Sequence, residues 1–260
     1  MLRTINATRY LTPLREGGSV PAIVEADDFG LYVLKFRGAA QGPKSLIAEL
    51  VAGEIGRALG LLVPELVFME LDPVLGRSEP HAEIQALIQA SAGLNLALDY
   101  LSGALAFDPL AKPEPDPALA SAIVWFDAYV TNVDRTPRNT NMLLWHRRLW
   151  LIDHGAALYF HHTWRDYLAR SQSPFSPIKQ HVLLPFASLL METNAELSPR
   201  LTPAILEGIV NLIPAEWLGD VPGFASPDEQ RAAYLAYLSN RLAAAPLFVE
   251  EAIHARAQLV

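Results

Sequence analysis

The most informative segment of the chain runs from residue 131 to residue 155 and reads TNVDRTPRNTNMLLWHRRLWLIDHG. A polar and irregular stretch comes first, which is typical of a loop. Two short apolar runs follow, flank a basic turn and end at Asp153. This spacing predicts a loop, then a β-hairpin, then a carboxylate at the end of the hairpin.

Two carboxylates and a carboxamide lie in this segment at positions that suit phosphoryl transfer. Asp134 is followed by Asn139 five residues later, and Asp153 comes after the hairpin. Phosphoryl transfer requires a carboxylate beside the acceptor hydroxyl and oxygen ligands for Mg²⁺. Mg²⁺ prefers one or two carboxylates together with phosphate oxygens and water. We therefore expect Asp134 and Asn139 to be catalytic, with Asn139 and Asp153 as the magnesium ligands.

The order of these residues is also that of protein kinases, in which D-x-x-x-x-N precedes D-F-G. Here His154 stands in place of the phenylalanine. The alternative is that Asp134 caps a turn, that Asn139 and Asn141 are ordinary turn residues, and that Asp153 merely ends a strand. It accounts poorly for Asp153, because an unpaired carboxylate after an apolar run would cost several kcal/mol of desolvation, which a bound cation would offset.

The N-terminal part of the chain carries the strand signals. Two β-rich runs, 20–25 and 31–36, are joined by a turn rich in Asp and Gly, and this predicts an antiparallel hairpin. A helix is predicted over 44–62, after Pro43, and a further strand over 65–71.

Lys35 lies in the second β-rich run, and strand alternation places it on the face of Leu31 and Val33. A lysine on an apolar face needs a partner, which ATP phosphates and a helix carboxylate would supply. The alternative is a frayed edge from which Lys35 reaches water. For the carboxylate, Glu49 and Glu54 both remain open: the apolar arc of the helix is centred near Glu54, whereas small residues beside Glu49 permit close approach.

Two further groups are expected at the nucleotide. Backbone N–H groups of Gly17, Gly18 and Ser19, just before the first β-rich run, are candidates for the phosphates. Backbone groups of Glu70 and Leu71 are candidates for adenine, because these residues are placed to connect two lobes.

The rest of the chain is mostly helical in composition and spacing. Helices are predicted over 117–130, 178–193, 202–213 and 227–256. The segment 82–105 is weakly periodic and interrupted by Gly93. We therefore expect an α+β, bilobal, protein-kinase-like fold, with a small antiparallel β-rich N-lobe over 1–75 and a larger, mostly helical C-lobe over 76–260.

Composition limits the class of protein and its partners. The chain has 260 residues, of which 51 % are hydrophobic, so that it is long enough for a large core or two lobes. Its net charge of −8, without a long basic run, argues against a nucleic-acid partner. It contains no cysteine and no apolar stretch of about 18 residues. We expect a soluble bacterial protein of the reducing cytoplasm, without a membrane partner.

These residues resemble the HipA-like serine/threonine kinases, which have the protein-kinase-like fold and are similar to the phosphatidylinositol kinases. The resemblance lies in residues 132–139, 152–153 and 33–35, and it covers about residues 15–160. It also includes Glu49, followed by the helix end RALGL at 57–61. In the family a glutamate precedes such a helix end at about this distance, which favours Glu49 over Glu54.

The resemblance implies a role for each matching residue. It implies that Asp134 is the catalytic base, that Asn139 and Asp153 bind Mg²⁺, and that Lys35 binds ATP phosphates. It implies transfer to a serine or threonine hydroxyl. HipA toxins have D-x-H where this chain has Thr136 as the third residue, so the resemblance does not extend to toxin activity.

The function expected from the sequence is therefore ATP- and Mg²⁺-dependent phosphoryl transfer to a protein or a small-molecule hydroxyl. Two alternatives remain open: a catalytically inactive kinase-like module that binds nucleotide, and an enzyme that transfers AMP. The sequence indicates neither the acceptor nor the oligomeric state.

Overall fold

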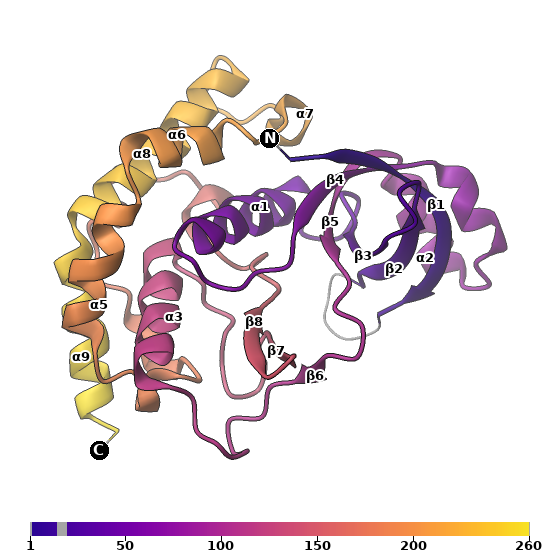
Figure 1. The fold of residues 1–260 in the computed structure, drawn as a ribbon. Coiled ribbons are helices and arrows are strands. Elements are labelled where there is room, and N and C mark those ends of the chain that lie inside the picture. The colour runs from indigo at the N-terminus through magenta and orange to yellow at the C-terminus, as the bar shows by residue number, and fades with distance from the viewer. Residues whose placement is uncertain (1, 15–19, 260) are drawn as a thin grey trace.

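The computed structural model of the chain describes residues 2–14 and 20–259. Its N-terminal part consists mainly of β-strands and its C-terminal part mainly of helices, as predicted (Figure 1). Helix α1 (Pro43–Ala58) lies between the strands and the C-terminal helices. The bilobal α+β arrangement therefore has α1 at its centre.

The described strands of the N-terminal part form a closed barrel in the order β1-β2-β3-β5-β4. These strands are β1 (Thr4–Pro13), β2 (Ala22–Ala26), β3 (Leu31–Lys35), β4 (Leu66–Leu71) and β5 (Gly93–Asp99). The predicted hairpin is confirmed as β2 and β3, which pair antiparallel. β1 and β4 pair in parallel and close the barrel, which adds a parallel pair to the antiparallel strands expected.

Strand alternation fixes which side of β3 meets the rest of the molecule. Tyr32 and Leu34 point into the barrel core, where they pack with Val24 of β2. Lys35 lies on the opposite face, towards α1, as the alternation of the sequence predicts.

The segment 82–105 differs from the prediction, because its second half is a strand. Helix α2 (Ala82–Ala90) ends before Gly93, whose φ of +93° suits glycine. β5 then runs between β3 and β4. Its leucines alternate in the sequence, and Leu96 and Leu98 pack into the main core while Ala97 faces the barrel core. The barrel thus continues beyond the predicted boundary at residue 75, and we propose a boundary after Asp99.

The hairpin predicted after the loop that carries Asp134 and Asn139 is confirmed. β7 (Met142–Trp145) and β8 (Arg148–Leu151) pair antiparallel, and β6 (Leu105–Ala106) pairs with β7. Both residues of the turn, His146 and Arg147, have positive φ, at 46° and 62°. Such a turn matches the twist of the flanking strands. It brings the two ends of the hairpin, which adjoin Asn141 and Ile152, side by side.

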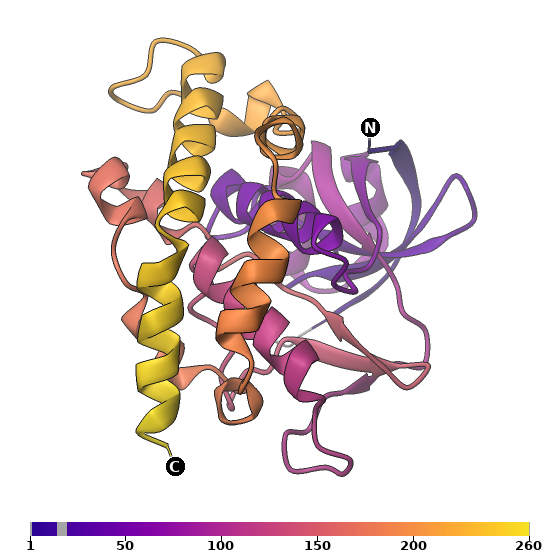
Figure 2. The same ribbon diagram turned by 60° about the vertical axis from the view of Figure 1, so that its left-hand side comes forward.

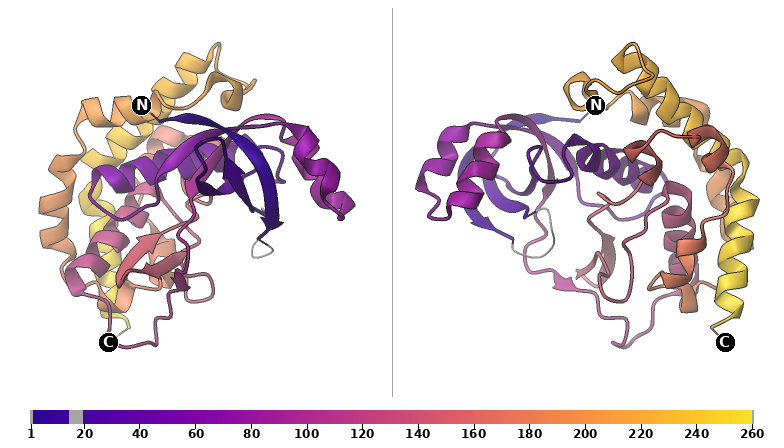
Figure 3. Two further views of the ribbon diagram at one scale, coloured as in Figure 1. Left: turned by 45° about the vertical axis from the view of Figure 1, so that its right-hand side comes forward. Right: turned by 180° about the vertical axis from the view of Figure 1, so that it is seen from behind.

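Most of the C-terminal helices lie on the side of α1 away from the barrel (Figures 2 and 3), whereas Trp217 contacts Phe68 and Leu94 of the barrel. The longer ones are α3 (Pro117–Val130), α5 (Leu190–Leu197), α6 (Pro203–Val210), α8 (Pro227–Ala243) and α9 (Ala245–Ala257). The short helices and 3-10 turns are η1 (Pro73–Ser78), η2 (Tyr159–His162), α4 (Tyr167–Ser171), η3 (Ser176–Gln180), η4 (Leu184–Phe186), η5 (Ser198–Arg200) and α7 (Ala215–Leu218). Within the described ranges, no helix combines the length and the apolar character required to cross a membrane.

Glycine and proline account for three differences from the predicted helices. α1 stops at Ala58, before residue 62, because Gly60 adopts a φ of +86°. The helix predicted over 178–193 is interrupted by turns around Pro185, and α5 begins only at Leu190. The helix predicted over 227–256 is divided at Ala244, because Pro246 has no N–H with which to continue the ladder.

Candidate active site

Lys35, at the end of β3, contacts carboxylates from two other parts of the fold. Its Nζ lies 3.3 Å from Oε2 of Glu49 in α1 and 2.6 Å from Oδ1 of Asp153, which follows β8. The Lys35 side chain is only 11 % exposed. It therefore does not extend into water from a strand edge, but joins the barrel, α1 and the segment after the hairpin.

The structure selects Glu49, rather than Glu54, as the helix partner of Lys35. Glu49 is 1 % exposed, whereas Oε1 of Glu54 lies 3.2 Å from Nε of Arg57 on the same helix. Periodicity could not decide between them because α1 is buried over most of its circumference, including the small residues Ala52 and Gly53. An apolar arc does not mark the buried face of such a helix.

The electrostatics keep both Lys35 and Glu49 charged. Burial by itself lowers the pKa of the Lys35 ammonium, but the negative charges of Glu49 and Asp153 outweigh burial and raise that pKa. Burial raises the pKa of the Glu49 carboxyl, but Lys35 and then His154 outweigh it, so that the pKa lies below its usual value. The result is a fixed ammonium group with one side towards Asp153, a suitable position for contacts with phosphate oxygens.

The catalytic-loop candidates also lie together. Asn139 donates from Nδ2 to Oδ2 of Asp134 over 2.7 Å. Asn141 donates from Nδ2 to the same Asp134 oxygen over 3.3 Å and to the backbone oxygen of Asp153 over 3.5 Å. Asp134 and Asp153 are therefore separated by a single bridging side chain, Asn141, and Asn139 lies on the outer side of Asp134.

Asn141 is the residue that the sequence reasoning did not select. It is 8 % exposed and adopts a φ of +47°, whereas Asn139 is exposed. Its position directly before the apolar run of β7 was the available signal, because a polar residue at a strand end is held in place by the sheet. Asn139 belongs to the tighter turn that precedes it, where its N–H and carbonyl oxygen pair with Thr136.

A buried ion pair anchors the catalytic loop to α3. Nε of Arg135 lies 2.5 Å from Oδ2 of Asp127, and both side chains are fully buried. Arg135 also donates to the backbone oxygen of Asn141. Nε2 of His181 lies 2.9 Å from the same Asp127 oxygen, and Asn132 donates to Oδ1 of Asp127 over 2.9 Å. Asp127 therefore orients the loop on which Asp134 lies.

The environment of Asp134 suits a group that accepts a proton. Burial raises the pKa of its carboxyl, the hydrogen bond from Asn141 opposes that shift, and the nearby charge of Asp153 adds to it. The net shift is upward. A base works best when its pKa approaches the working pH, so the shift favours proton acceptance from a hydroxyl.

The donor atoms at this site fit magnesium better than zinc. In the described part of the chain, no group of three or more His, Cys, Asp or Glu side chains is placed to hold a metal ion. The donors that converge are carboxylates of Asp134 and Asp153 and carboxamides of Asn139 and Asn141. Mg²⁺ takes oxygen ligands and retains several waters. The Asp153 side chain is 43 % exposed, which leaves room for water and phosphate oxygens.

The prediction that Glu70 and Leu71 connect the two lobes requires correction. After β4 the chain forms η1 and α2 and returns to the barrel as β5. The Leu71 side chain lies in the barrel core and is 3 % exposed. The chain passes to the helical part only after Asp99, where the N–H of Tyr100 donates to the carbonyl oxygen of Leu31 over 2.9 Å. The link between the lobes is therefore 100–104.

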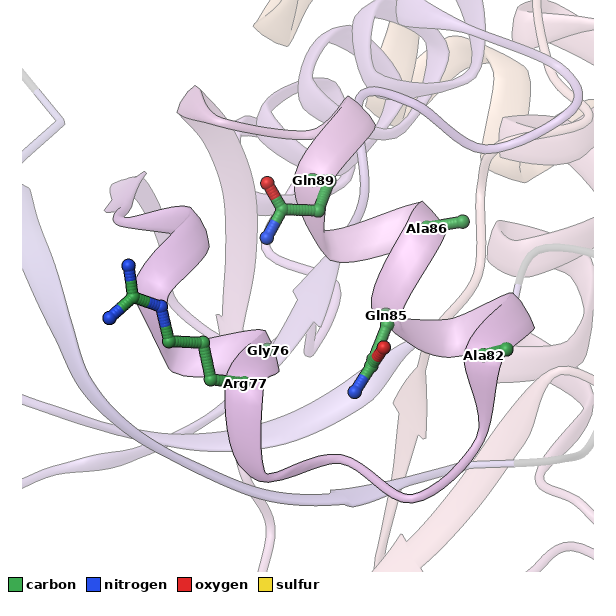
Figure 4. A pocket seen from close by; sticks show the side chains of 6 residues that line it. All are labelled: Gly76, Arg77, Ala82, Gln85, Ala86 and Gln89. Carbon is green, nitrogen blue, oxygen red and sulfur yellow. The ribbon is translucent and has the colours of Figure 1, made fainter.

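One predicted group cannot be located here, and one hollow lies away from this site. Gly17, Gly18 and Ser19 lie outside the described residues, so their predicted contact with phosphates stays a prediction. A hollow between η1 and α2 lies on the barrel side remote from α3 (Figures 1 and 4). It is lined by Gly76, Arg77, Ala82, Gln85, Ala86 and Gln89. It presents one cation and two amides but no carboxylate, and therefore offers no comparable metal chemistry.

Comparison with known proteins gives a family match over most of the chain. The model of the family described as HipA-like kinase matches residues 8–243. The match extends well past residue 160, where the resemblance in the sequence ended, and includes most of the C-terminal helices. None of the curated protein sequences compared with the chain matches it.

Two solved kinase structures have a similar fold. The proinflammatory kinase CtkA of Helicobacter pylori is 13 % identical, with a TM-score of 0.59 and full coverage of both chains. The Golgi casein kinase with manganese and ADP bound is 13 % identical, with a TM-score of 0.52, covering 96 % of this chain and 73 % of that chain. At such identities the likeness establishes the kinase fold.

Proposed function

The chain belongs to the HipA-like kinase family, and we propose that it transfers the γ-phosphate of ATP, with Mg²⁺, to a hydroxyl group. The acceptor is a serine or threonine side chain of a protein or the alcohol of a small molecule. Phosphotransfer itself follows from the family, and the proposal concerns the nucleotide, the metal and the kind of acceptor.

The observation that carries the proposal is the meeting of Lys35, Asp134 and Asp153 between the barrel and the helical part. Lys35 reaches Asp153 directly, and Asn141 bridges Asp153 and Asp134. A cation for phosphate oxygens, a metal-binding carboxylate and a base for the acceptor thus lie next to one another. Phosphoryl transfer depends on this kind of positioning and charge neutralisation rather than on covalent chemistry.

Each residue then has a defined role. Lys35, held by Glu49, contacts the phosphate oxygens of the nucleotide. Asp153 and a carboxamide of the catalytic loop hold the metal, which neutralises phosphate charge when bound. Asn139 remains the candidate from the sequence, while the bridge from the Asp134 carboxylate to the backbone of Asp153 favours Asn141. Asp134 orients the acceptor hydroxyl and accepts its proton.

We place adenine beside the link at 100–104 rather than at Glu70 and Leu71. The backbone of this link leaves β5 next to β3, the strand that carries Lys35. The N–H groups of Tyr100 and Ala104 and the carbonyl oxygens of Leu101 and Ser102 are already paired. The other backbone N–H and C=O groups of the link are therefore our candidates for the donor and acceptor that an adenine edge requires.

The test is phosphate transfer by the parent chain and by Asp153→Asn. Each protein is incubated with Mg²⁺ and ATP labelled at the γ- or the α-phosphate, together with a peptide mixture and a small-molecule alcohol mixture. We expect γ-label on an acceptor or on the protein itself, and a loss of at least about 100-fold in Asp153→Asn, because a charge-neutralising ligand is removed. Asp220→Asn, an exposed carboxylate far along the chain, is the matched control.

The other outcomes separate the alternatives. Transfer of α-label would identify AMP transfer. Nucleotide binding without transfer of either label would identify an inactive module. An unchanged rate in Asp153→Asn would eliminate the metal assignment.

A further inference from the structure

The imidazole ring of His154 is buried beside the proposed active site and has no role in the mechanism described above. His154 follows Asp153 directly and is 0 % exposed. Its ring packs edge-on against Phe126 of α3, with 5.7 Å between ring centroids. Its Nε2 has no hydrogen-bond partner among the described residues. An unpaired buried polar atom is costly, so that a ring of similar shape without nitrogen would suit the packing better.

The other two nitrogen atoms of His154 both reach Glu49. The backbone N–H of His154 donates to Oε2 of Glu49 over 3.0 Å, and Nδ1 lies 3.3 Å from Oε1. Oε2 is also the oxygen that contacts Nζ of Lys35. The two oxygens of one buried carboxylate are thus held by the residue next to Asp153 and by the lysine that contacts Asp153.

The charge state of Glu49 determines the direction of the second bond. The pKa of the Glu49 carboxyl lies below its usual value, because the positive charge of Lys35 outweighs burial. An ionised carboxylate only accepts hydrogen bonds, so Nδ1 of His154 must carry the proton and donate it.

We propose that His154 is a positioning residue. Its imidazole Nδ1–H fixes the Glu49 carboxylate, which in turn keeps the Lys35 ammonium in contact with Asp153. The inference rests on the proposed function of this site. It explains why a histidine with one unpaired nitrogen stands where packing alone favours an apolar ring. It also ties α1 to the metal-binding segment through Glu49, so that a shift of α1 would move Lys35 away from Asp153.

Three substitutions separate the ring's packing from its Nδ1–H donor. His154→Phe keeps an aromatic ring against Phe126 and removes both nitrogens. His154→Asn places an amide N–H near the position of Nδ1, whereas His154→Gln places one near the position of Nε2. The readouts are the Kd for Mg²⁺-ADP, the KM for ATP and the Tm of each full-length variant.

We expect His154→Phe and His154→Gln to raise the Kd for Mg²⁺-ADP and the KM for ATP by about tenfold, since a hydrogen bond to a charged group is lost. His154→Asn restores most of the affinity. The Tm of His154→Phe changes little, because removal of the unpaired Nε2 offsets the loss of the bond to Glu49. Parent-like nucleotide affinity in His154→Phe would overturn the inference, as would equal affinities of the Asn and Gln variants.

A second measurement tests the hydrogen bond without nucleotide. The ¹⁵N and ¹H resonances of the His154 ring in the parent chain report which nitrogen carries the proton. Protonated Nδ1 supports the inference, and a ring protonated only at Nε2 overturns it. If the parent chain binds no Mg²⁺-ADP, the proposed function fails, and this measurement still decides on the contact between His154 and Glu49.

Discussion

Nζ of Lys35 and Oδ1 of Asp153 lie 2.6 Å apart, although 118 residues separate them in the chain. The contact joins the last residue of β3 to the carboxylate that follows the hairpin of β7 and β8. It connects the proposed nucleotide side of the site to the proposed metal side. The role of the Lys35 ammonium can therefore be tested by substitution.

Lys35→Met should abolish phosphate transfer while the fold persists. Methionine keeps the length of the stem but removes the ammonium, and removal of one charge-stabilising group costs on the order of 100-fold or more in rate. The substitution also leaves Glu49 buried without a cation, which lowers the free energy of unfolding. The double variant with Glu49→Gln should recover the Tm but not the rate. Recovery of transfer in the double variant would contradict the role of Lys35.

Asn141→Ala should weaken the binding of Mg²⁺ more than Asn139→Ala does. Asn141 bridges Asp134 and Asp153, whereas Asn139 reaches only Asp134. We expect the Mg²⁺ concentration for half-maximal transfer to rise by roughly tenfold or more in Asn141→Ala. Titration of both variants with Mg²⁺ at saturating ATP checks this. The reverse order would return the metal assignment to Asn139.

Breaking the buried pair of Asp127 and Arg135 should destabilise the protein strongly. Both side chains are fully buried, and loss of one partner leaves an uncompensated charge. Asp127→Leu should lower the free energy of unfolding by about 3–5 kcal/mol in urea. Asp127→Leu combined with Arg135→Met should lose less stability than Asp127→Leu alone, because no buried charge remains. A double variant that is less stable than either single variant would show that the pair itself, rather than the orphaned charge, supplies the stability.

His161 should make the protein less stable in mild acid. Its ring is buried, with Nδ1 3.0 Å from the Tyr234 hydroxyl, and burial lowers its pKa well below the usual value, with smaller effects of His162 and Lys44 in the same direction. The unfolded chain therefore binds the proton more readily than the folded chain. Stability is present above about pH 6.5 and is lost below it, at up to roughly 1.4 kcal/mol per pH unit.

Urea unfolding between pH 7.5 and 5, in ~0.5-unit steps, measures this slope. His161→Phe should flatten it, because the titrating group is removed. His254→Gln, at an exposed position on α9, is the control and should keep the parent slope. A slope unchanged in His161→Phe would assign the acid sensitivity to another group.

Local signals predicted a large part of this molecule. The hairpin of β7 and β8 was predicted because two apolar runs flank a short basic turn. Lys35 was assigned to the correct strand face because alternation depends only on neighbouring residues. The start of α1 at Pro43 and of α3 at Pro117 was also predicted, since proline at the first helical turn is a local signal.

Other features depended on contacts that no local pattern records. β5 was missed, although its leucines alternate, because a central strand that is buried on both faces resembles a short buried helix in a sequence. The misplaced link at Glu70 and Leu71 followed from that omission. Pro246 divides α8 from α9, a signal that was present in the chain but outweighed by the helical composition around it.

The kinase-like order of Asp134, Asn139 and Asp153 and the division of the chain into β-rich and helical halves follow from the linear order of residues, because spacing and periodicity are properties of neighbouring residues. The tertiary structure was needed to pair Lys35 with Glu49 rather than Glu54, to place Asn141 between the Asp134 carboxylate and the backbone of Asp153, and to give Asp127 and His154 their contacts. These relationships join residues from different elements, and they arise from the packing of α1 and α3 against the barrel and the hairpin. Burial in the folded protein then shifts the pKa values of these groups and fixes their hydrogen-bond partners. In the unfolded chain the same groups are exposed to water and have neither the shifts nor the fixed partners.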